Sequence, residues 1–119
     1  MASQTARLLD GRILAANLIA GREAVLDLGA YSYIHAMFRV LRKGTATNAN
    51  TVVRLQHAAV MEEDAWVDLP NSSVVVDSTA SGSVVYIVVS SFSRYVRWST
   101  GTGDFAGGPI VVIDIVAKE

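Results

Sequence analysis

The sequence predicts an all-β protein, an antiparallel β-sandwich with jelly-roll-like connections and an N-terminal arm. Three observations lead to this fold class. Segments rich in Val, Ile, Tyr and Thr recur from residue 22 onward, clusters of Gly, Asn, Asp and Ser separate them, and the spacing is roughly 8–12 residues. The chain of 119 residues has the length of one domain. We therefore expect an arm over residues 1–21 and a β-sandwich domain over residues 22–119.

Each expected strand is a run of β-branched and aromatic residues bounded by turn-forming residues. The loops KGTATNAN and GTGDFAGG precede the third and the last expected strand. The shorter loops MEED, PNS and TASG separate the strands in the middle of the chain. In chain order, strands are expected at residues 23–29, 33–41, 50–60, 65–69, 73–78, 83–90, 93–99 and 109–117.

The alternation of side chains within these strands predicts which faces are buried. Residues 33–41 alternate well, with Ile34 and Phe38 on one face and His35 and Arg39 on the other. The strands at 83–90 and 109–117 are instead apolar on both faces, whereas an antiparallel sheet with one solvated face alternates cleanly. Loops or another subunit must then cover the second face. The candidate subunit-interface residues are Val84, Tyr86, Val88, Ile110, Val112 and Val116.

The N-terminal 21 residues contain one apolar run, residues 13–20, which is compatible with a short helix or with an arm lying on a neighbour. Charged residues interrupt the apolar residues before it, so neither a membrane span nor a signal peptide is expected. Because an isolated short helix is marginal in water, the run is expected to order on another surface. The candidate contact residues of this arm are Arg12, Ile13, Leu14, Leu18 and Ile19.

Composition excludes several classes of partner and of chemistry. The hydrophobic share of 51% is high and the charged share of 18% is low, which favours burial between subunits. A formal net charge of −1 gives no general attraction to nucleic acid or to acidic membranes. The chain has no cysteine, which removes disulfides, thiolate nucleophiles and Cys-ligated zinc. A cytosolic assembly route fits this composition.

No motif predicts catalysis, a cofactor or a metal. The two histidines, His35 and His57, fall on different expected strands without metal-ligand spacing. The acidic run at residues 62–64 lacks the pattern of a calcium loop, and residues 101–108 lack the lysine and the helix of a phosphate loop. The serines have no evident His and Asp partners. We expect no enzymatic activity and no cofactor.

The stretch SFSRYVRW, residues 91–98, interleaves arginines with aromatic residues, as nucleic-acid platforms do. In a strand, however, Arg94 and Arg97 point to opposite faces and cannot form one basic stripe. The structural interpretation puts Val96 and Trp98 in the core, with Arg97 paired to an acid or extended across a boundary. We therefore expect no nucleic-acid partner.

The order of strand signatures resembles small β-sandwich virion proteins of tailed bacteriophages, in particular capsid decoration (cement) proteins. The matching pieces are residues 52–59, 66–69, 92–98, 100–101 and 109–119. This resemblance implies a virion subunit, assembled in the bacterial cytoplasm as a homo-oligomer, most often a trimer. It would bind the major capsid protein or another virion protein between capsomers, and the candidate contact residues of the N-terminal arm would then be capsid-contacting.

Two alternatives remain open at the sequence level. One is a carbohydrate- or receptor-binding module that uses exposed aromatic residues such as Trp66 and Tyr31. The other is a tail or head-completion subunit.

Overall fold

The computed structural model describes residues 3–46, 52–76 and 84–119. It confirms an all-β protein with two antiparallel sheets of four strands each, consistent with a β-sandwich. Apart from strands, the described residues contain the short 3-10 turns η1 (Arg22–Ala24) and η2 (Glu63–Ala65), and no helix among them is long and apolar enough to cross a membrane. The strands are β1 (Ser3–Ile13), β2 (Leu26–Asp27), β3 (Tyr33–Arg42), β4 (Val52–Ala58), β5 (Val67–Val75), β6 (Val84–Val89), β7 (Tyr95–Thr100) and β8 (Ile110–Lys118).

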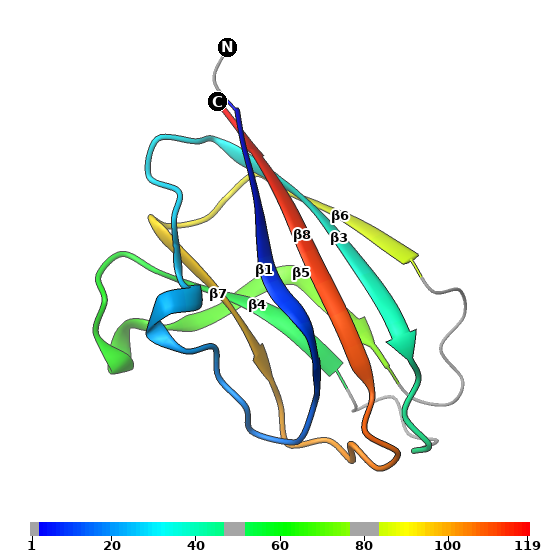
Figure 1. Cartoon of the computed structure of the whole chain (residues 1–119). Helices are drawn as coiled ribbons and strands as arrows, with labels where there is room; N and C mark the ends of the chain where they lie inside the picture. The colour runs from blue at the N-terminus through cyan, green and yellow to red at the C-terminus, as the bar shows by residue number, and fades with distance from the viewer. Residues whose placement is uncertain (1–2, 47–51, 77–83) are drawn as a thin grey trace.

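One sheet has the strand order β1-β8-β3-β6 and the other the order β2-β7-β4-β5. Apart from the step from β4 to β5, each strand is followed along the chain by a strand of the opposite sheet. The two ends of the chain lie close together, because β1 runs antiparallel to β8 (Figure 1). The expected jelly-roll-like connections remain a prediction.

The core lies between the two sheets and follows the predicted alternation. Ile34 and Phe38 of β3 are buried, and alternate residues of β8 from Val111 to Ala117 are buried with them. From the opposite sheet, Val96 and Trp98 of β7 enter the same core. Burial of these large apolar side chains is the main favourable term in folding.

The prediction of a separate N-terminal arm is corrected by the structure. Residues from Ser3 to Ile13 pair with β8 as an edge strand of the first sheet. The following residues lie beside β7, where the amide of Ala20 donates to the carbonyl of Trp98 at 3.2 Å and Ile19 bridges to Ser99. The N-terminal segment thus contributes to both sheets, and the sandwich begins before residue 22.

Two irregularities explain why β1 does not read as a strand in the sequence. Its register with β8 shifts between Arg7 and Leu9, and again between Asp10 and Ile13. The first shift turns both Leu8 and Leu9 into the core, which breaks the period of two that marks a regular strand.

Two of the expected strands, 65–69 and 73–78, are largely one. β5 runs continuously from Val67 to Val75 and passes through Asn71, whose φ is +58°. Asparagine tolerates this left-handed conformation better than most residues. The buried Ser72 hydroxyl beside it donates its single proton to the carbonyl of Leu55 or of Leu69, and its oxygen accepts from the Leu55 amide at 3.3 Å. The expected strand at 23–29 is shorter than predicted, with only Leu26–Asp27 paired.

Substitutions within β1 test its place in the core. We expect Leu9→Ala to lower the free energy of unfolding by about 2–5 kcal/mol, because a buried leucine leaves a cavity. Ile13→Ala, at an exposed position of the same strand, is expected to change it by less than about 0.5 kcal/mol. Chemical denaturation measures both. If residues 3–13 were an arm outside the fold, both substitutions would leave the free energy of unfolding unchanged.

Candidate functional site

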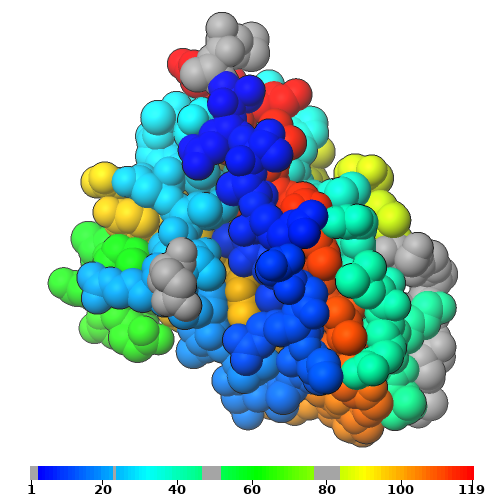
Figure 2. All heavy atoms as spheres, viewed as in Figure 1, coloured from blue at the N-terminus to red at the C-terminus, as the bar shows by residue number. Residues whose placement is uncertain are grey.

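The sheet β1-β8-β3-β6 turns one face to the core and the other to the outside. We call the second the outer face, and Figure 2 shows β1, β8 and β3 side by side in one view of the molecule. Strand register brings together on it residues from all four strands: Thr5, Arg7, Asp10, His35, Met37, Arg39, Val84, Tyr86, Val88, Ile110, Val112, Asp114 and Val116.

The most exposed apolar part of the outer face is β6, the strand at the end of this sheet's order. Val84, Tyr86 and Val88 are 45%, 72% and 62% exposed, while Val89 between the sheets is buried. Large apolar side chains at a sheet edge are unfavourable in water and often mark a contact with another chain.

The three candidates on β8 share this face but are more covered. Val112 is only 4% exposed, and Ile110 and Val116 are half-buried. Their strand lies between β1 and β3, whose side chains flank them on both sides. The structure therefore brings all six predicted interface residues to one face, with β6 providing its accessible part.

A small ionic network occupies the middle of the outer face. Nε of Arg7 donates to Asp114 at 2.9 Å, and a guanidinium nitrogen of Arg39 donates to the same carboxylate at 3.2 Å. Arg7 also contacts Asp10 at 3.2 Å. Hydrogen bonding from Arg7, followed by the charges of the two arginines, lowers the pKa of Asp114 below its ordinary value. The carboxylate is therefore ionised at neutral pH.

The five residues predicted to form the capsid-contacting arm have different environments. Leu14 is buried in the core, and Leu18 packs against it. Arg12, Ile13 and Ile19 remain exposed. They do not form one free arm, because β1 and the residues after it are bound to the two sheets.

The structure bears out the predicted burial in residues 91–98, although Arg94 precedes β7. Val96 and Trp98 are buried, and the two arginines lie apart: Arg94 pairs with Asp27 at 2.8 Å, whereas Arg97 contacts Glu63 at 3.5 Å. No shared basic stripe results from this stretch.

The two histidines lie in different sheets. His35 is on the outer face, and Nδ1 of His57 accepts a hydrogen bond from the Ser93 amide at 2.8 Å. Within residues 3–46, 52–76 and 84–119, no group of three or more His, Asp or Glu side chains could hold a metal ion.

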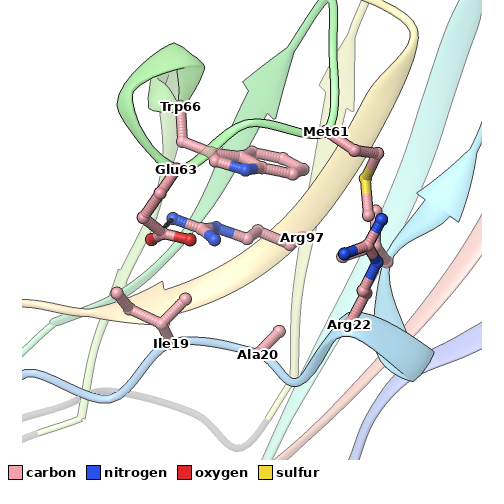
Figure 3. A pocket seen from close by; sticks show the side chains of 8 residues that line it. Ile19, Ala20, Arg22, Met61, Glu63, Trp66 and Arg97 are labelled. Atoms are coloured by element: carbon pink, nitrogen blue, oxygen red, sulfur yellow. Dashed lines mark ion pairs between the residues drawn. The ribbon is translucent and has the colours of Figure 1, made fainter.

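The aromatic residues considered for sugar binding are partly covered. Tyr31 is half-buried and packs against the core. The guanidinium of Arg97 lies 4.2 Å from the centroid of the Trp66 ring and covers one of its faces (Figure 3). Sequence reasoning missed this pair, because Trp66 and Arg97 come from different parts of the chain and no motif links them.

Comparisons with protein-family profiles, with curated protein sequences and with solved structures find no significant match.

Asp114→Asn tests the ionic network. Because the pKa of Asp114 is lowered in the folded protein, its ion pairs add stability above about pH 4, and this contribution is lost as the pH falls through the lowered pKa. We expect the variant to be less stable than the wild type by about 1 kcal/mol at pH 7, a modest value because both arginines are partly exposed. The difference should shrink as the pH falls below about 4 and the Asp114 carboxylate takes up its proton.

Urea denaturation at pH 7 and at successively lower pH values, down to the lowest at which the protein is folded, measures this difference. Asp10→Asn is the control, because Asp10 is highly exposed and contacts Arg7 alone. A constant difference across the pH range would show that Asp114 acts through packing and not through its charge.

Proposed function

We propose that this protein is a non-enzymatic structural subunit that assembles through the outer face. The observation that carries the proposal is the exposure of Val84, Tyr86 and Val88 in a row along β6. Transfer of such side chains from water into an interface is favourable by about 25 cal/mol per Å² of apolar surface.

The finer proposal is a subunit of a tailed-bacteriophage virion, specifically a capsid decoration protein. Its support is the resemblance of the strand signatures, together with the strand order. Eight strands ordered β1-β8-β3-β6 and β2-β7-β4-β5 fit a jelly roll, an architecture found in viral capsid proteins and also in lectins. In this role the protein would form a homotrimer and clamp neighbouring capsid proteins against the pressure of packaged DNA.

The size of the apolar patch is relevant to how such a subunit would work. Burying three side chains contributes a few kcal/mol at about 1.5–3 kcal/mol each, which is comparable to or less than the cost of association. A trimer that binds a repeating lattice at several points gains affinity from multivalency without a larger contact on each subunit. Weak individual contacts are thus compatible with stable decoration.

The alternatives differ in the surfaces that they use. A tail or head-completion subunit would employ the same apolar face with another virion protein. A sugar-binding module would need an open aromatic ring, and the face of Trp66 that Arg97 covers is not open for stacking. The geometry therefore disfavours stacking of a sugar on that face of Trp66.

Assembly is tested by changing the most exposed residue of β6. We expect the wild type to be a homo-oligomer at micromolar concentration and Tyr86→Asp to shift it to a monomer with the same circular dichroism spectrum, because a buried carboxylate without a partner is unfavourable. Light scattering after size-exclusion chromatography measures the mass. Val67→Asp is the control, since Val67 is 56% exposed on the opposite sheet. A monomeric wild type, or an oligomer unaffected by Tyr86→Asp, would contradict the assembly proposal.

The virion proposal has its own test, co-sedimentation of the purified protein with phage heads that lack it. Wild type and Val67→Asp are expected to sediment with the heads, and Tyr86→Asp is expected to remain in solution because the trimer's multivalent contacts are lost. If the protein is an oligomer that never binds heads, the capsid assignment is wrong while the assembly proposal stands.

A further inference from the structure

A pocket of about 280 Å³ lies on the other sheet, away from the outer face. Three stretches of chain build it: residues 19–25 beside β7, the connection from β4 to β5 that contains η2, and β7 itself. Figure 3 shows Trp66 and Arg97 on one side, Met61 and Arg22 on another, and Ile19 and Ala20 nearby. The full lining is Ile19, Ala20, Arg22, Val25, Met61, Glu63, Trp66 and Arg97.

The distinctive feature of this pocket is the buried guanidinium of Arg97. The residue is only 5% exposed, yet its ion pair with Glu63 is long, at 3.5 Å, and the Glu63 side chain is 79% exposed. Its Nε donates to the side-chain carbonyl of Gln56 at 2.9 Å, and its plane lies against Trp66. These contacts fix the orientation of the guanidinium. It has five N–H groups, which is more than its contacts to Gln56 and Glu63 use, so it can also donate to a ligand.

The lining holds two guanidinium groups and one carboxylate, and Glu62 and Asp64 flank that carboxylate on the same connection. Arg22, which is exposed, contributes a second guanidinium to the lining, and Glu63 is the one carboxylate there. A planar carboxylate matches a guanidinium in two parallel hydrogen bonds, which makes such pairs stronger than neutral hydrogen bonds. Ile19, Val25 and Met61 supply apolar surface for the rest of a ligand.

We propose that this pocket binds the carboxylate of a small acid, with Arg97 and Arg22 as its partners. In the free protein, Glu63 partly fills the place of that carboxylate and moves toward solvent when a ligand enters. The volume suits a body between an amino acid and a monosaccharide in size. This activity goes beyond assembly and is independent of it, because none of the outer-face residues line the pocket.

The carboxylate has two chemical sources, a free acidic sugar or an acidic side chain, and two probes represent them. D-glucuronate stands for the first and N-acetyl-glutamate amide for the second, with glucose and N-acetyl-glutamine amide as neutral controls. Binding is followed by NMR through the indole N–H resonance of Trp66. We expect at least one acid to give a saturable shift with a dissociation constant of about 1–10 mM, and its neutral control to give none.

Variants connect this binding to the pocket. Arg22→Gln should weaken it about tenfold, the usual effect of losing one charged hydrogen bond, and the variant should fold like the wild type because Arg22 is exposed. Glu63→Gln should tighten it by about threefold or more, because a competing carboxylate is removed. Lys43→Gln, an exposed change of the same charge outside the pocket, should leave it unchanged. Arg97→Gln should abolish binding, and its own spectrum shows whether the variant is folded.

The outcomes separate clearly. A shift with glucuronate alone assigns an acidic sugar, a shift with the glutamate derivative alone assigns an acidic side chain, and a shift with both assigns carboxylate recognition without selection of the body. The proposal is overturned if neither acid binds at about 50 mM, a concentration that detects even very weak sites. It is also overturned if the neutral controls bind equally well, if inorganic phosphate alone binds, or if Arg22→Gln and Glu63→Gln change nothing.

Discussion

The pairing of β1 with β8 is the interaction on which the rest of the structure depends. It joins the two ends of the chain, so almost the whole sequence lies between its partners. Closing such a long loop costs conformational entropy, and the ladder and the burial of Leu8 and Leu9 compensate for it. With β1 in place, β8 is flanked on both sides, its inward residues fill the core, and its outward residues form the centre of the outer face.

The two sheets have different outward surfaces, and these suggest separate roles. On the outer face, a salt-bridge network around Asp114 lies beside the exposed apolar row of β6. On the other sheet, polar pairs such as Arg54 with Asp68, at 2.8 Å, accompany the pocket around Arg97. Large apolar side chains on an end strand often mark a contact with another chain, whereas recognition pockets combine apolar walls with a few fixed polar groups. The proposed assembly and the proposed carboxylate binding therefore use surfaces of matching chemistry.

Much of the fold could be predicted from the sequence, and the exceptions have physical causes. The valine-rich strands and their alternation predicted the sandwich, the burial of Trp98 and the shared face of the interface candidates. β1 was missed because its bulges turn adjacent leucines inward, which resembles a helical or irregular pattern. The β5 strand was divided because Pro70 and Asn71 are turn formers, although the strand continues through them. The Arg97 pocket could not be predicted, because its lining depends on how three distant segments meet in space.

The central claim is that the outer face is covered when the protein assembles, and hydroxyl-radical footprinting with mass spectrometry tests it directly. Met37 and Tyr86 are on this face, while Tyr95 of the other sheet and Met61 of the β4–β5 connection serve as internal references for residues of the same types. The account predicts that labelling of Met37 and Tyr86 falls as the protein concentration rises through the range of assembly, while labelling of Met61 and Tyr95 stays constant. If assembly proceeds with Met37 and Tyr86 labelled as strongly as in the dilute protein, another surface forms the contact and the account is wrong.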